Sequence, residues 1–251
     1  MIRLVRSELF KLRTTRLYLG LLVAATGLVV VVTGVQLAFT GESSVTIEGA
    51  SSVVETEEDL RSILNAGGIA SLFTLVLGAT AVASEYRHRT IAGTYLITPT
   101  RSRVVLAKIV TYFFAGFVFG VVVEAGGLAV VSGWLAISGE AIPFGTQVAE
   151  TLALTPVLTG LSAAFGVGIG ASVPNQLGAV LVSLGWVMVV EQLLSGLFPE
   201  VAPWLPFSGV NAALTGQNPE FGAAVAIGLS LAYLAAVSTI GIQVVRNRDI
   251  A

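Results

Sequence analysis

Six long apolar segments dominate the pattern of hydrophobic and polar positions along the chain. A membrane-spanning helix needs about 20 mostly apolar residues, because the hydrocarbon layer is about 30 Å thick and each residue rises about 1.5 Å. Segments of this length predict an all-helical integral membrane protein, a single domain over 1–251, with spans at 17–39, 64–84, 109–131, 151–173, 177–198 and 221–245. The second span is the weakest, because Asn65, Gly67 and Gly68 stand near its start.

The composition supports this assignment. Only 11% of the residues are charged, whereas a soluble domain carries about 25%. The chain contains no cysteine, which excludes disulfides and zinc–thiolate sites. The apolar run over 17–39 is longer than the core of a signal peptide, which has about 7–15 residues, so we expect a retained first span.

The basic residues predict how the spans are oriented. Twelve of the thirteen lysines and arginines fall within 1–16, 85–108 and 246–251, which lie on one side of the membrane in a six-span arrangement. Lysine and arginine mark cytoplasmic connections. Both termini are therefore predicted to be cytoplasmic, and the acidic connection over 40–63 is predicted to lie outside.

The first sixteen residues form an amphipathic pattern. Ile2, Val5, Leu9 and Leu12 are spaced to share one face of a helix. This pattern predicts an interfacial helix in the inner headgroup layer of the membrane lipid, which then turns into the first span. The alternative is a basic anchor with no further role.

The segment between spans two and three carries charge at both ends and an apolar stretch over 91–97. It is too long for a hairpin loop and too short to span. We expect a short helix lying along the membrane and ending at Pro99, with Thr100 or Ser102 capping the next helix. Glu85 is expected to pair with nearby arginines or with the N-terminal helix.

These motifs resemble a known family. The segment between spans two and three resembles that of permease subunits of type-2 ABC exporters at Glu85, Arg87, Thr90, Leu96, Pro99, Arg103 and Lys108. The start of the chain is similar to the same family at Glu8, Lys11, Leu12 and Arg16. Arg89 is a departure, because the family often has glycine there.

The resemblance implies a substrate path through the prokaryotic plasma membrane, energised by a separate ABC ATP-binding subunit. That partner would hold ATP and Mg²⁺, because this chain has no phosphate-binding loop; the chain itself is then not an enzyme and binds no cofactor. The implied coupling residues, with Arg101 from the same segment, are Glu85, Arg87, Thr90, Pro99, Arg101, Arg103 and Lys108. Glu8, Lys11 and Arg16 form the implied N-terminal interface. A second permease copy or a related chain completes the unit.

Two carboxylates, Glu124 and Glu191, fall within predicted spans. A charge at mid-membrane costs about 2.5–3.5 kcal/mol, so they are candidates either for a polar substrate path or for sites near the outer headgroups. They also leave open an ion-coupled secondary transporter or a non-transporting membrane subunit. An intramembrane enzyme is disfavoured, because His88 and the two aspartates lie outside the spans.

Other features refine this picture without changing it. His88, the only histidine, stands among arginines, so we expect no metal site. Nothing in the charge pattern indicates a nucleic-acid partner. Prolines between spans five and six predict an outer interfacial or re-entrant structure. Gly116 and Gly120 have the spacing of a close helix–helix contact.

Overall fold

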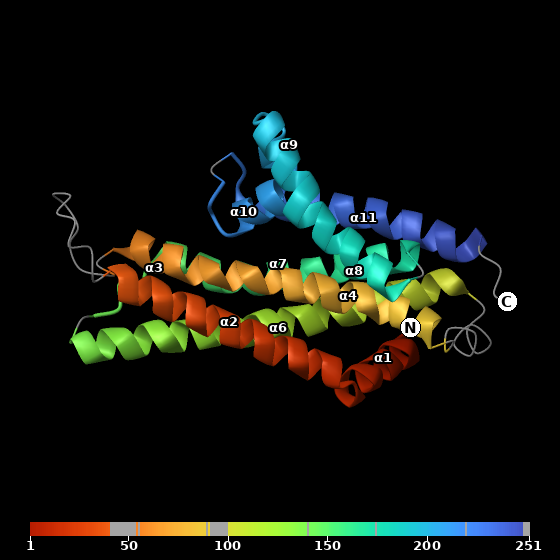
Figure 1. Ribbon diagram of the computed structural model, residues 1–251, viewed down its shortest axis with the longest axis horizontal. Coiled ribbons are helices and arrows are strands. Elements are labelled where there is room, and N and C mark those ends of the chain that lie inside the picture. The colour runs from red at the N-terminus through yellow and green to blue at the C-terminus, as the bar shows by residue number, and fades with distance from the viewer. Residues whose placement is uncertain are drawn as a thin grey trace.

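The computed structural model describes residues 1–40, 54, 56–88, 90, 100–139, 141–173, 175–218 and 220–247. Within these residues the chain is helical and contains no strand. Six of the described helical segments are long and apolar enough to cross a membrane. The predicted all-helical class is therefore confirmed (Figure 1).

Each predicted span overlaps one of these helical segments. The first half of the chain forms α1 (Ile2–Thr14), α2 (Arg16–Thr40), α3 (Glu57–Leu64), η1 (Asn65–Ile69), α4 (Ala70–Arg87), α6 (Arg101–Ser138) and α7 (Thr146–Ser172). The second half forms α8 (Gln176–Gly185), η2 (Trp186–Val190), α9 (Glu191–Leu197), η3 (Ala202–Trp204), η4 (Pro206–Val210), α10 (Asn211–Leu214) and α11 (Ala223–Asn247).

Span two is continuous from α3 through η1 to α4. The chain tightens into a 3₁₀ turn at η1, where the sequence is weakest as a helix. Thr56 caps α3 through a reciprocal pair of hydrogen bonds with Asp59. α6 has 38 residues and is about 57 Å long, so it exceeds the thickness of a hydrocarbon layer.

α4, α6 and α7 form the centre of the molecule, and small residues allow them to approach closely. A Cβ atom on Gly166 of α7 would meet the backbone of α4 at Leu75. On α6, a Cβ atom on Gly116 would lie 2.6 Å from the carbonyl oxygen of Thr159. Gly116 and Gly120 both face α7, in agreement with the predicted packing role.

The outer helices are much less covered by protein. Span two and α7 are each 72% buried over their most apolar stretches, whereas α2 and the segment 176–197 are each 17% buried. In Figure 1 the segment from α8 to α9 leaves the bundle at a steep angle, so that α9 projects from it. This segment contains the π-helical turn η2.

α1 turns a charged residue and not only apolar residues toward the protein. Ile2 and Leu9 are 85% and 40% exposed, whereas Glu8 and Leu12 are buried. Glu8 turns toward the bundle, where it meets a buried lysine. After Thr15, whose backbone is extended, the chain turns directly into α2 as expected (Figure 1).

The predicted short helix over 91–97 and its end at Pro99 lie outside the described residues. Thr100 stands at the N-cap of α6, but its side chain makes no capping hydrogen bond. The predicted capping role of Thr100 is therefore wrong.

Candidate functional site

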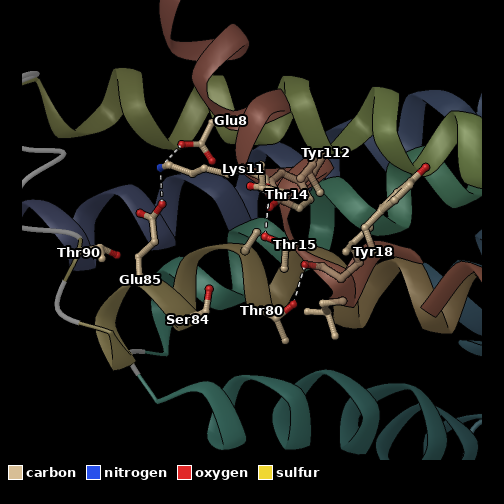
Figure 2. Close-up of a pocket in the computed structure, with 14 residues that line it drawn as sticks. Glu8, Lys11, Thr14, Thr15, Tyr18, Thr80, Ser84, Glu85, Thr90 and Tyr112 are labelled. Atoms are coloured by element: carbon tan, nitrogen blue, oxygen red, sulfur yellow. Dashed lines mark hydrogen bonds and ion pairs between the residues drawn. The ribbon is translucent and has the colours of Figure 1, made fainter. Parts of the chain in front are cut away.

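Four charged side chains from three helices form a closed ring of ion pairs, which we call the charge ring. Its members are Glu8 and Lys11 of α1, Glu85 of α4 and Lys108 of α6. Lys108 Nζ lies 2.6 Å from Glu8 Oε2 and 2.8 Å from Glu85 Oε1. Lys11 Nζ lies 2.7 Å from Glu8 Oε1 and 2.7 Å from Glu85 Oε1, as Figure 2 shows.

Three members of the charge ring are buried. Lys108 is 2% exposed, Glu8 3% and Glu85 7%. The ammonium group of Lys108 uses all three of its donors, because it also donates to the carbonyl oxygen of Ala81 at 3.3 Å. A buried charge without a partner is strongly destabilising, and here the formal charges of two carboxylates and two ammonium groups cancel.

Lys11 closes the ring at its exposed edge, since 44% of its side chain is exposed. Burial of the other half lowers the pKa of Lys11, but the hydrogen bonds from its ammonium group to Glu8 and Glu85 outweigh this effect. The net result is a pKa above the ordinary value. Lys11 therefore stays charged and holds α1 to the end of α4.

A cavity of about 300 Å³ lies beside the charge ring, between the turn from α1 to α2 and the bundle. Its polar lining is mostly hydroxyl groups, which come from Thr14, Thr15, Tyr18, Thr80, Ser84, Thr90 and Tyr112 (Figure 2). Glu85 Oε2 is buried and has no hydrogen-bond partner among the described residues. Glu85 therefore retains an unused acceptor beside this cavity.

Of the remaining predicted docking residues, Pro99 lies outside the described residues, and Arg87, Thr90, Arg101 and Arg103 are not members of the charge ring. Arg87 donates to Gln176 Oε1 at 3.2 Å, and the backbone of Thr90 donates to the carbonyl oxygen of Glu85 at 3.0 Å. Arg16 and Arg103 are exposed. The structure thus brings together four of the predicted residues.

Arg101 makes a contact that the sequence did not predict. Its guanidinium donates to the carbonyl oxygen of Val245 at 2.7 Å and to that of Arg246 at 3.3 Å. These carbonyls belong to the last turn of α11, whose negative dipole end favours a cation. Arg101 therefore ties the start of α6 to the end of α11.

Glu191 has a well-defined partner set. Its side chain is fully buried and accepts hydrogen bonds from Trp186 Nε1 at 2.8 Å, from the backbone of Ser208 at 2.6 Å and from the backbone of Phe207. Glu191 therefore caps the first turn of η4 and fixes it against span five.

Glu124 lies elsewhere, on α6, and contacts different elements. It is 4% exposed and shares a hydrogen bond with Thr155 of α7. Its Oε1 atom has no partner among the described residues. The carboxylate lies against Gly67 at the 3₁₀ turn of span two, where an added Cβ atom would displace it.

No model of a known protein family matches the chain, and a comparison with curated proteins finds no match.

Proposed function

We propose that this chain is the transmembrane permease subunit of an ATP-driven exporter, and that a separate ATP-binding subunit drives it. The charge ring is the observation that carries the proposal. It joins three helices at the basic end of the molecule, where the resemblance to type-2 ABC exporters expects the partner to dock. The two predicted motif regions, around Glu8 and around Glu85, meet at this ring.

The charge ring is suited to transmit a displacement. Its buried ion pairs join α1, α4 and α6, so a force applied to one of these helices moves the others. α4 packs closely on α7 through glycine contacts, and Arg101 joins α6 to α11. A motion at the basic end therefore reaches four of the six candidate spans.

The surface around the ring carries the charge that a partner needs. The three helices that form the ring also carry exposed arginines, namely Arg3, Arg6, Arg13, Arg87 and Arg103. They attract an acidic protein surface and the anionic headgroups of the inner leaflet. We place this end in the cytoplasm of a prokaryotic cell and the segment from α9 to α10 at the outer surface.

The poorly covered helices support assembly with a second permease chain. α2, the segment 176–197 and α11 are only 17%, 17% and 22% buried over their apolar stretches. Lipid covers such faces well, and so does a second transmembrane chain. We propose a unit of two permease chains, identical or related, with two ATP-binding subunits.

The test is co-purification from native membranes in detergent, followed by measurement of ATP hydrolysis. We expect a chain with a Walker A loop to co-purify, and Arg103→Glu to weaken its retention. Glu200→Arg is the matched control, because it reverses an exposed charge outside the basic end and is expected to leave retention unchanged.

Two results would contradict the proposal. One is export that continues in ATP-depleted vesicles and stops when an ion gradient collapses, which indicates an ion-coupled transporter. The other is normal partner binding after the segment 85–103 has been scrambled, which removes the proposed docking site.

A further inference from the structure

A second cavity is separate from the one beside the charge ring and is made of different groups. It has a volume of about 510 Å³ and is lined by residues of η1, α4, α7, η2, α9, η4 and α10 and of the turn that follows α10. We call it the carboxamide cavity, because Asn65, Gln192, Asn211 and Gln217 line it. Four serine and threonine side chains, including Ser195 and Ser208, add hydroxyl groups.

None of the described residues that line the carboxamide cavity is charged. Asn65 Oδ1 is buried and has no hydrogen-bond partner among the described residues. Polar groups left unpaired beside lipid are unfavourable, so this composition requires water or a polar ligand.

The wall of the cavity is fixed by specific contacts. Glu191 holds the backbone of Phe207 and Ser208, and both residues line the cavity. Val187, which also lines it, belongs to the π-helical turn η2, a local distortion that is frequent at functional sites. Glu191 is therefore a positioning residue for this wall.

We infer that the carboxamide cavity binds an uncharged, polyhydroxylated group, such as a sugar or a polyol. Carboxamides and hydroxyls both donate and accept hydrogen bonds, as the hydroxyls of such a ligand do. A charged ligand would lose hydration and find no counter-charge among the described lining residues, since Arg61, which lies against Gly216, does not line the cavity. Phe207 and Leu158 offer apolar surface to the ligand's C–H groups. In the proposed exporter this cavity would receive the polar part of the substrate, so the inference rests on the proposed function.

Direct binding tests the inference without the ATP-binding partner. The full chain is purified in a polyoxyethylene detergent, which carries no sugar. Saturation-transfer difference NMR is then recorded with glycerol, glucose and maltose as probes. We expect at least one of them to bind. Its affinity should fall by about tenfold in Gln192→Leu and in Asn211→Leu, because each substitution removes about one hydrogen bond to the ligand.

Gln243→Leu is the matched control, because Gln243 is exposed on α11 and lies outside the cavity. It is expected to leave binding unchanged, and size-exclusion chromatography shows whether each variant is folded. Binding of none of the three probes overturns the inference. Equal binding in all variants also overturns it, as does stronger binding of glucuronate or of N-acetylalanine amide.

The two proposals fail separately. If the neutral probes bind but no ATP-hydrolysing chain associates, the proposed function fails and the cavity assignment stands. If the partner associates and depends on Arg103 but no probe binds, only the cavity assignment fails.

Discussion

Lys108 is the residue on which the charge ring depends most. It is almost fully buried and pairs with both carboxylates of the ring. In Lys108→Met, the carboxylates of Glu8 and Glu85 keep only one cationic partner, the half-exposed Lys11. Because breaking a buried ion pair from one side is strongly destabilising, we expect a loss of about 3–5 kcal/mol in the free energy of unfolding.

Thermal or denaturant unfolding of the purified protein measures this loss. Lys11→Met is the comparison, because it removes the same charge at the exposed edge of the ring, and its effect should be clearly smaller. A Lys108→Met protein as stable as the wild type would show that the buried pairs contribute nothing.

The raised pKa of Lys11 predicts a specific dependence on pH. A lysine whose pKa is higher in the folded state stabilises fully below its ordinary pKa of 10.5 and loses that contribution as the pH rises through the folded value. The stability difference between wild type and Lys11→Met should therefore be constant from neutral pH up to about pH 10.5, where both carboxylates stay ionised, and shrink above it. Unfolding curves over an alkaline pH series measure this, and a difference that shrinks already near neutral pH contradicts it.

At the scale of elements, the contact between α4 and α7 depends on missing side chains. A Cβ atom on Gly166 would overlap the backbone of Leu75 and lie 2.7 Å from the backbone nitrogen of Ala79. Neither backbone can move without moving a whole helix. We expect Gly166→Ala to destabilise the protein by about 1–3 kcal/mol, as overpacked cores do.

Gly133→Ala is the matched control on α6, because a Cβ atom added there would have no neighbour within 4 Å. Alanine is a better helix former than glycine by about 0.5–1 kcal/mol, so this change should be neutral or stabilising. Equal effects of the two substitutions in unfolding experiments would contradict the tight packing of α4 on α7.

The sequence predicted the helices well and their contacts poorly. Hydropathy locates the spans, because a helix in lipid must be apolar over its whole length. The same uniformity hides which face of each helix meets a neighbour. The charge ring joins residues 74 and 100 positions apart, and no local pattern specifies that approach. The motif resemblance named all four residues of the ring, and the pairing of Glu85 with the N-terminal helix was one of the two expected alternatives; the pairings of Lys108 were not predicted.

The residues of the carboxamide cavity were also not predicted from the sequence. Sequence reasoning selected Glu124 and Glu191 because a carboxylate in a span is conspicuous, and Glu191 instead holds the backbone of η4. The lining residues are uncharged and come from segments scattered between Asn65 and Gln217. The sequence indicates this cavity only through uncharged polar residues within or beside the apolar spans, and such residues are a weak indication of a binding site.

At the scale of the whole molecule, the charge distribution predicts the orientation in the membrane. The chain has no cysteine, so single cysteines can report which side each end occupies. We expect a cysteine at Glu200 to react with a membrane-impermeant maleimide in intact cells, because the positive-inside rule places that connection outside. A cysteine at Arg13 should react only after the membrane is opened, and the reverse pattern would contradict the proposed orientation.

The charge ring has an electrical consequence. Moving one elementary charge through the full membrane potential involves about 2.3 kcal/mol per 100 mV. The ring holds two carboxylates and two ammonium groups bonded to one another, so its formal charge is zero. When α1, α4 and α6 shift together, the ring moves as a neutral unit and the field does almost no work on it. The ring itself therefore adds almost no voltage dependence to such a shift.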